Sequence, residues 1–221
     1  VNRLVGLAET DERVRVIHQP NAGPAAARNT SFRNSSGRYV CLLDSDDLLE
    51  PTYLEKCAWF LDSNPEYAFC NAYTVAFGEQ EFLWTQGFER GKAHLQTNIG
   101  PVFSVIRRAA YADCGGFDET IHVGHEDWDF WLAMANAGHW GHTIPEFLQW
   151  YRKKGNGRFE QVMRDASVNE AFESAMHRKY KSLESRFPTP ARRLSTPYQG
   201  IETEPLVCNP LLENQAGRRI L

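Results

Sequence analysis

The sequence predicts an α/β fold with a mostly parallel sheet and helices on the faces of that sheet. Residues 39–43 form an apolar run with aromatic and β-branched members, which is typical of a buried strand. The run ends in three carboxylates within four positions, at residues 44–47. Upstream, an alternating run at residues 13–17, a turn and a helix lead into this strand, and that order favours a βαβ unit with parallel strands.

The remaining elements follow from hydrophobic periodicity and from turn residues. Further strands are expected where β-branched and aromatic residues gather between turns, at 67–77, 101–106, 143–144 and 147–151, with a looser aromatic segment at 82–88. Helices are expected at 2–9, from Pro24 to about 34, from Pro51 to Leu61, at 107–113, from Glu126 to about 137, and at 160–184.

Composition narrows the class of protein. The 221 residues carry a net charge of −4 without a basic block, which argues against nucleic acid as the main partner. No apolar stretch approaches the about 18 residues that a transmembrane helix needs. Five cysteines at irregular spacing favour buried, reduced thiols over a disulfide framework, so we expect a cytoplasmic protein.

The carboxylates after residue 43 are the first candidate site. Asp44 and Asp46 are two positions apart and point the same way if strand geometry persists, while Asp47 turns aside. Ligands of open α/β sheets bind at the carboxyl ends of strands, where two carboxylates suit Mg²⁺ or Mn²⁺ with a phosphorylated ligand. The alternative is a polar turn whose aspartates cap the next helix.

An ordered set of motifs resembles the family-2 glycosyltransferases, nucleotide-sugar enzymes of the Rossmann-like A-type glycosyltransferase fold. Between about residues 13 and 157 the similar segments are Asn-Ala-Gly…Ala-Arg-Asn (21–29), Gly-Arg-Tyr-Val…Asp-Ser-Asp-Asp (37–47), Cys-Gly-Gly-Phe-Asp-Glu (114–119), His-Glu-Asp-Trp-Asp-Phe-Trp (125–131) and Tyr-Arg…Asn (151–156). Each motif is weak alone, but the order of the set is specific.

Two departures from the family pattern bear on the domain boundaries. The first strand of the family, and a second strand ending in Asp-Asp-Gly-Ser, have no counterpart here, and Val1 is not a natural initiator. We therefore expect residues 1–186 to be a glycosyltransferase domain incomplete at its N-terminus. Residues 187–221, rich in proline, are expected to form a linker or tail.

The resemblance implies a nucleotide-diphosphate sugar as the donor and a Mg²⁺ or Mn²⁺ ion as the cofactor. It implies that Asp44 leans toward the ribose or sugar, with a share in the metal site, and that Asp46 binds the metal. Arg28 would contact the nucleotide or the diphosphate; its alternative is a solvated helix charge. Asp47 is expected to cap the next helix or to orient its neighbour.

The Glu-Asp pair supplies the candidates for the second half of the reaction. Asp127 is expected to be the general base of an inverting transfer, and Glu126 to bind acceptor hydroxyls. The alternative for both is a favourable charge at a helix N-terminus. The acceptor is expected to be a carbohydrate or a lipid-linked carbohydrate. A lipid-linked acceptor would place the cytoplasmic protein at the inner face of a membrane.

A rival function comes from a different class of protein. Without the first strands of the family, the chain could be a non-catalytic, glycosyltransferase-like module that binds a partner or a sugar. A metal-dependent phosphohydrolase built on the aspartate cluster ranks below both, because no nucleophile-and-base pair is recognisable.

Overall fold

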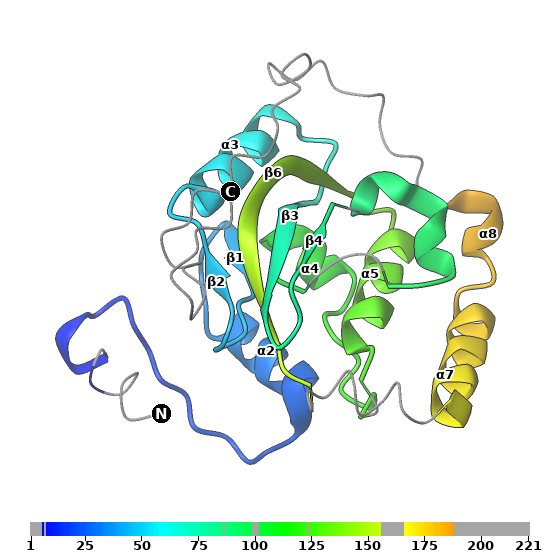
Figure 1. Cartoon of the computed structure of the whole chain (residues 1–221), viewed down its shortest axis with the longest axis horizontal. Helices are drawn as coiled ribbons and strands as arrows, with labels where there is room; N and C mark the ends of the chain where they lie inside the picture. The colour runs from blue at the N-terminus through cyan, green and yellow to red at the C-terminus, as the bar shows by residue number, and fades with distance from the viewer. Residues whose placement is uncertain are drawn as a thin grey trace.

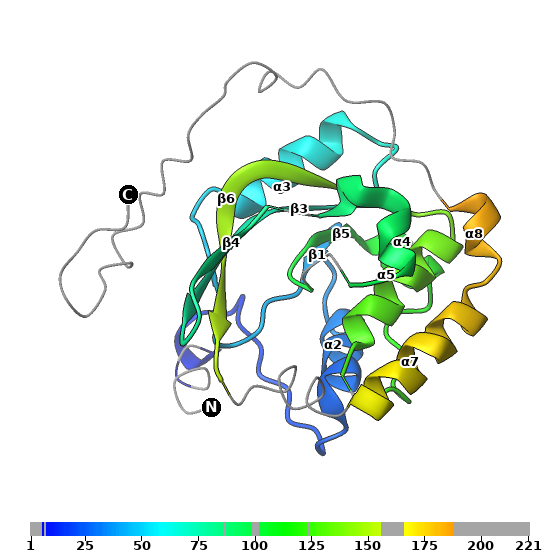
Figure 2. The ribbon, with the colours of Figure 1, turned by 45° about the vertical axis from the view of Figure 1, so that its right-hand side comes forward.

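The computed structural model describes Gly6 and residues 8–85, 87–98, 102–122, 124–155 and 166–187. A six-stranded sheet lies at its centre, between the helix α3 on one face and the helices α2, α4 and α5 on the other (Figures 1 and 2). The strands are β1 (Tyr39–Cys41), β2 (Leu48–Leu49), β3 (Phe69–Gly78), β4 (Phe82–Trp84), β5 (Val105–Arg107) and β6 (Gly141–Lys153). The helices are α2 (Gly23–Arg33), α3 (Tyr53–Ser63), the 3-10 helix η1 (Phe88–Leu95), α4 (Arg108–Asp113), α5 (Glu126–Asn136), α7 (Ala166–Lys179) and α8 (Leu183–Arg186).

The α/β class and the flanking helices are confirmed, but the sheet is mixed rather than mostly parallel. Its order is β1-β5-β3-β6-β2, with β4 paired to β3. The β3–β6 pair is parallel, whereas the four other pairs are antiparallel. The strands β1, β3 and β6 therefore run one way and β2, β4 and β5 the other. An apolar run is equally compatible with either direction, so the sequence pattern could not reveal this.

The predicted βαβ unit is also wrong. Residues 13–17 are extended but join no strand of the described chain, and Ile17 is 44% exposed. Alternation of apolar and polar residues reports which side chains could be buried, whereas a strand also needs a hydrogen-bonding neighbour. Among the described residues, no strand therefore precedes the helix α2.

Most other elements form close to their predicted ranges. The strand expected at 101–106 begins later, as β5 at Val105, and Pro101 lies outside the described residues. The aromatic segment 82–88 divides into β4 and the start of η1. The helix expected at 160–184 is found as α7 and α8, and residues 160–165 lie outside the described residues, as do residues 2–5 and 7 of the helix expected at 2–9.

The long strand β6 bends strongly where proline interrupts it (Figure 2). Ile144 pairs with Ala72 and Phe147 with Tyr73, so Pro145 and Glu146 have no partner on β3. Proline cannot donate to the ladder, and the extra residues form a bulge that turns the strand. The second half of β6 thereby curves over the sheet toward β2.

Two hydrophobic clusters cover the two faces of the sheet. On the α3 face, Tyr53, Cys57 and Leu61 pack against Cys70 and Ile144. The opposite cluster is largely aromatic and includes Trp128 and Trp131, which are 1% and 0% exposed. The described cysteines are free, and Cys57 and Cys70 are buried.

Candidate active site

A cavity of about 750 Å³ opens beside the C-terminal ends of β1 and β6, next to the loop that follows β1. All five candidate site residues line it: Arg28, Asp44, Asp46, Glu126 and Asp127. They come from α2, from the loop after β1 and from the first turn of α5, which are far apart in the sequence. The cavity therefore brings together two separate pairs of carboxylates.

The first pair, Asp44 and Asp46, lies on a tight turn after β1. The Asp47 N–H donates to the Asp44 carbonyl at 3.1 Å, which closes the turn. The side chains of Asp44 and Asp46 are 46% and 38% exposed, so both carboxylates are accessible from the cavity. Lys154 Nζ lies 2.5 Å from Asp46 Oδ2 and neutralises part of this charge.

Asp47 has a structural position. Its side chain is buried, and its Oδ1 accepts a hydrogen bond of 2.8 Å from the Arg152 N–H at the end of β6. Burial raises the pKa of the Asp47 carboxyl to about 7, and the carboxylates of Asp44 and Asp46 act in the same direction. Because α3 begins at Tyr53 with Thr52 as its N-cap, Asp47 does not cap that helix; it ties the aspartate turn to β6.

Arg28 lies between the two carboxylate pairs. Its Nη1 donates to Glu126 Oε1 at 2.8 Å, and its Nη2 is 3.2 Å from both oxygens of Asp44. The side chain is 11% exposed, which contradicts the alternative of a solvated helix charge. Burial lowers the pKa of Arg28, but Asp44 and Glu126 raise it by more, and the guanidinium stays charged.

The second carboxylate pair begins α5. Glu126 is buried and Asp127 is half-buried. Asp127 Oδ1 accepts the Trp128 N–H at 2.9 Å, and Asp127 Oδ2 accepts the Asn98 amide at 2.8 Å. Burial and the neighbouring Glu126 raise the pKa of Asp127, while Arg28 and the two hydrogen bonds oppose that shift. A carboxylate with a raised pKa in a cavity is a candidate general base.

The turn of residues 114–119 supports the site through α2. Asn29 is buried; its Oδ1 accepts the Tyr111 hydroxyl and the Phe117 N–H, and its amide donates to the Phe117 carbonyl. Gly116 has φ +79, and a Cβ there would lie 2.7 Å from Asn29 Oδ1. The glycine is therefore required for the turn to dock on α2, next to Arg28.

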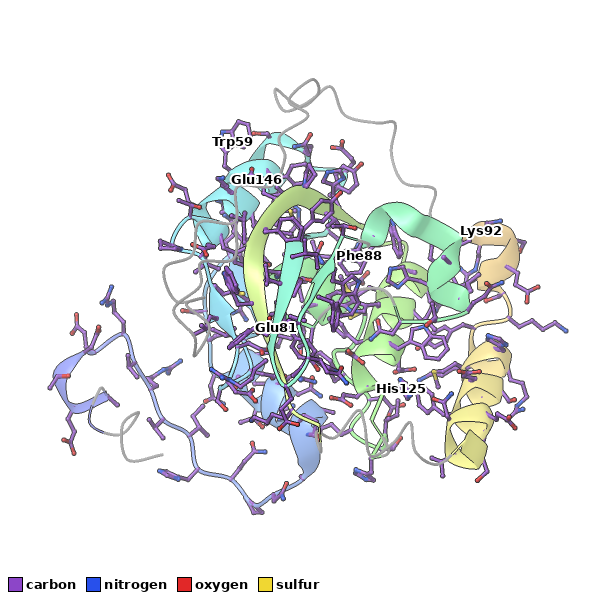
Figure 3. All side chains as sticks on the ribbon, viewed as in Figure 1. Trp59, Glu81, Phe88, Lys92, His125 and Glu146 are labelled. Carbon is purple, nitrogen blue, oxygen red and sulfur yellow. The ribbon has the colours of Figure 1, made fainter. Side chains whose placement is uncertain are left out.

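The helix α7 holds the start of α5 from outside. His125 has the left-handed φ of 61, its Nε2 lies 2.9 Å from Asn169 Oδ1, and its ring stacks on Phe172 at 5.2 Å. Figure 3 shows His125 beside α7 at this end of α5. In the first turn of α5, Asp129 accepts hydrogen bonds from Lys179 Nζ at 2.7 Å and from the Tyr180 hydroxyl at 2.8 Å. Asp129 is thus a structural residue.

The donor atoms of the aspartate turn fit a hard divalent cation. Two accessible carboxylates face one cavity, and Mg²⁺ in proteins is commonly held by one or two carboxylates together with substrate phosphates and water. Within the described part of the chain, no group of three histidine, cysteine, aspartate or glutamate side chains could hold a metal alone. A cation here would need a ligand to complete its coordination.

Several residues that line the cavity were not proposed from the sequence, among them Asn98, Phe82 and Trp84. Asn98 lies in a loop without a recognisable pattern, and Phe82 and Trp84 belong to the hairpin strand β4. They are recognised as site residues only because the fold brings them to the cavity that Asp127 also lines. Lys153 is buried and lines the cavity, whereas Arg152 Nε donates to the Asp46 carbonyl at 3.0 Å.

Comparison with known proteins identifies the family of this chain. The family model described as glycosyl transferase family 2 matches residues 3–125, more than half of the chain. This chain belongs to glycosyl transferase family 2. The match includes Arg28, Asp44 and Asp46 and ends one residue before Glu126.

Individual relatives of this family 2 chain are longer proteins. An uncharacterized glycosyltransferase of Rickettsia felis is 39% identical over 141 residues, which are 62% of this chain and 23% of that protein. The chondroitin synthase of Pasteurella multocida is 29% identical over 146 residues, which are 64% of this chain and 15% of that protein. The chain thus spans less than a quarter of the length of either relative.

Solved structures show the same fold. S. aureus TarS 1-349 in complex with UDP-GlcNAc has a TM-score of 0.57 at 16% identity, covering 83% of this chain and 60% of that one. The mannosyltransferase PcManGT from Pyrobaculum calidifontis, in complex with GDP-Man and Mn²⁺, has a TM-score of 0.51 at 18% identity, with coverages of 81% and 55%. Among the described residues of the family 2 chain, no helix is both long and apolar enough to span a membrane.

Proposed function

We propose that this family 2 chain transfers a sugar, with inversion, from a nucleotide-diphosphate donor to a hydroxyl of a carbohydrate or lipid-linked carbohydrate. The observation that carries the proposal is the meeting of Asp44 and Asp46 with Glu126 and Asp127 in one cavity, with Arg28 between them. The TarS complex with UDP-GlcNAc and the PcManGT complex with GDP-Man support this class of donor.

The donor would bind at the aspartate turn. Asp46 and Asp44 would hold a Mg²⁺ or Mn²⁺ ion, which when bound neutralises the charge of the diphosphate leaving group. The complex of PcManGT with Mn²⁺ supports the choice of cation. Arg28 and Lys153 add positive charge to the same cavity, so both are placed to contact the diphosphate.

The acceptor would bind at the start of α5. Asp127 removes the proton of the acceptor hydroxyl as its oxygen attacks the anomeric carbon from the side opposite the diphosphate. The bond between that carbon and the diphosphate oxygen breaks, and the bonding electrons leave with the diphosphate. Glu126, fixed by Arg28, binds the acceptor hydroxyls next to the reacting one.

Substitution of Asp127 by Asn tests the assignment in the intact protein. Asp127→Asn keeps the size of the side chain and its hydrogen bond to the Trp128 N–H but cannot accept the acceptor proton. We expect product formation from UDP-GlcNAc or GDP-mannose to fall by about 10²- to 10⁴-fold. Calorimetry with Mn²⁺ should show nearly unchanged binding of the nucleotide sugar.

The matched control is Asp113→Asn, which changes a 64% exposed carboxylate on α4. It should leave transfer at the wild-type rate. Wild-type transfer by Asp127→Asn would refute the role of the base. Nucleotide-sugar binding by the wild-type protein without turnover on any acceptor would instead support a non-catalytic binding module.

A further inference from the structure

The carboxylate of Asp127 is held by donors from two different elements. The Trp128 N–H on α5 binds Oδ1 at 2.9 Å, and the side-chain amide of Asn98, from the segment after η1, binds Oδ2 at 2.8 Å. A carboxylate fixed at both oxygens cannot rotate about its terminal torsion, which is otherwise broad. Each oxygen retains a second acceptor direction for another donor.

The segment that carries Asn98 is anchored on the helix that carries Asp127. The indole N–H of Trp128, the residue after Asp127, donates to the His94 carbonyl at 2.6 Å. The Gln96 N–H then closes the end of η1 on the Ala93 carbonyl at 3.1 Å. Asn98 follows two residues later and lines the same cavity as Asp127. The approach of the amide to the carboxylate is therefore set by packing between two elements.

A neutral donor suits the charges that surround Asp127. Glu126 adds negative charge on the same turn, Arg28 faces the pair from α2, and the imidazoles of His125 and His94 lie on the adjoining segments. A second cation next to Asp127 would stabilise the carboxylate so strongly that it became a poor base. An amide favours the ionised form and leaves the net charge unchanged.

We propose that Asn98 is a positioning residue, which orients the Asp127 carboxylate toward the acceptor and favours its ionised form. This inference rests on the proposed function, because it assigns Asn98 a part in transfer only if Asp127 is the base. No motif of the sequence marks Asn98, and its position in the fold alone brings it to Asp127.

The test is the pKa of Asp127 measured in the intact protein without any ligand. Carbon-13 NMR of labelled aspartate carboxyl groups follows the titration, and the signal that disappears in Asp127→Asn identifies Asp127. In Asn98→Ala the lost hydrogen bond should raise the pKa of Asp127 by about one unit. The acid limb of the pH profile of kcat/KM should move upward by the same amount, since the ionised form is the active base.

Two further variants complete the test. Asn34→Ala removes an exposed amide that donates to the Thr30 carbonyl at the far end of α2, and it should leave the pKa of Asp127 at the wild-type value. Asn98→Ser keeps a shorter donor and should give an intermediate pKa; it replaces Asn98→Ala if that variant does not fold.

The outcomes separate the two proposals. An unchanged pKa of Asp127 in folded Asn98→Ala and Asn98→Ser would overturn the role of Asn98, whatever the activity of Asp127→Asn. A raised pKa together with full transfer by Asp127→Asn would refute the role of Asp127 as the base, and therefore also the role of Asn98 in catalysis. A raised pKa with inactive Asp127→Asn supports both.

Discussion

The guanidinium group of Arg28 joins the two halves of the cavity. One nitrogen binds Asp44, at the expected donor site, and another binds Glu126, at the expected acceptor site. The planar fork of arginine can hold two carboxylates at once, whereas the single ammonium of lysine cannot match this geometry. The Ala-Arg-Asn segment of the sequence thus supplies adjacent residues with separate tasks: Arg28 enters the cavity and Asn29 binds the turn of residues 114–119.

His142 is a residue whose burial should affect stability rather than function. Its ring stacks on Phe60 at 4.7 Å and lies against Tyr67 at 5.3 Å. Burial lowers the pKa of His142 from 6.5 to about 4. The unfolded chain binds a proton at this histidine below about pH 6.5, whereas the folded chain binds it only below about pH 4. The free energy of unfolding therefore decreases as the pH falls from 6.5 to 4.

Replacement of His142 by Phe keeps an aromatic ring in the stack and removes this titration. Between pH 7.5 and pH 5 the wild-type protein should lose about 2 kcal/mol of unfolding free energy through this titration, and His142→Phe should not lose it. Urea denaturation at the two pH values measures the difference. The same stability difference at both pH values would contradict the prediction.

At the scale of elements, α2 and the turn of residues 114–119 depend on one buried side chain. Asn29 receives hydrogen bonds from Tyr111 and Phe117 and gives them to the Phe117 carbonyl and to Glu119. Asn29→Ala would leave several buried polar groups without partners, and we expect it to lower the free energy of unfolding by about 3 kcal/mol. Urea denaturation of Asn29→Ala provides the measurement.

The control for that experiment lies at the C-terminal end of the same helix. Asn34→Ala removes an exposed asparagine and should change the unfolding free energy by less than about 1 kcal/mol. A loss in Asn29→Ala no larger than that in Asn34→Ala would show that the turn docks on α2 by other contacts.

At the scale of the whole molecule, the cavity supplies two accessible carboxylates and needs further ligands for a cation. We therefore expect Mn²⁺ and a nucleoside diphosphate to bind cooperatively, each raising the affinity for the other by about 5- to 150-fold. Electron paramagnetic resonance of free Mn²⁺, titrated with and without UDP or GDP, measures this coupling.

One variant tests the source of this coupling, and a second variant serves as its control. Asp46→Asn removes one proposed ligand and should abolish it, whereas Asp62→Asn changes an exposed carboxylate paired with Arg38, away from the cavity, and should retain it. Equal Mn²⁺ affinity with and without either nucleotide would argue against a cation held between protein and diphosphate.

Much of the fold and the site could be predicted from the chain alone. The apolar run of β1 and the hydrophobic periodicity of α3 and α5 are local patterns, which can be recognised without knowing the partners of each segment. The five candidate site residues follow from ordered motifs and line one cavity. Short-range physics and family pattern were sufficient for these features.

Strand direction, the isolation of residues 13–17 and the curl at Pro145 depended on partners that are distant in sequence. The same long-range packing decided that Arg28 would bind both Asp44 and Glu126, and that Asn98 would meet Asp127. A sequence motif identifies the chemistry of a side chain but does not identify the residues that it will contact. Its neighbours are set by the way the end of β1, the helix α2 and the start of α5 come together in the fold. The start of α5 is far from the other two in the sequence, so a local pattern cannot show that they are in contact.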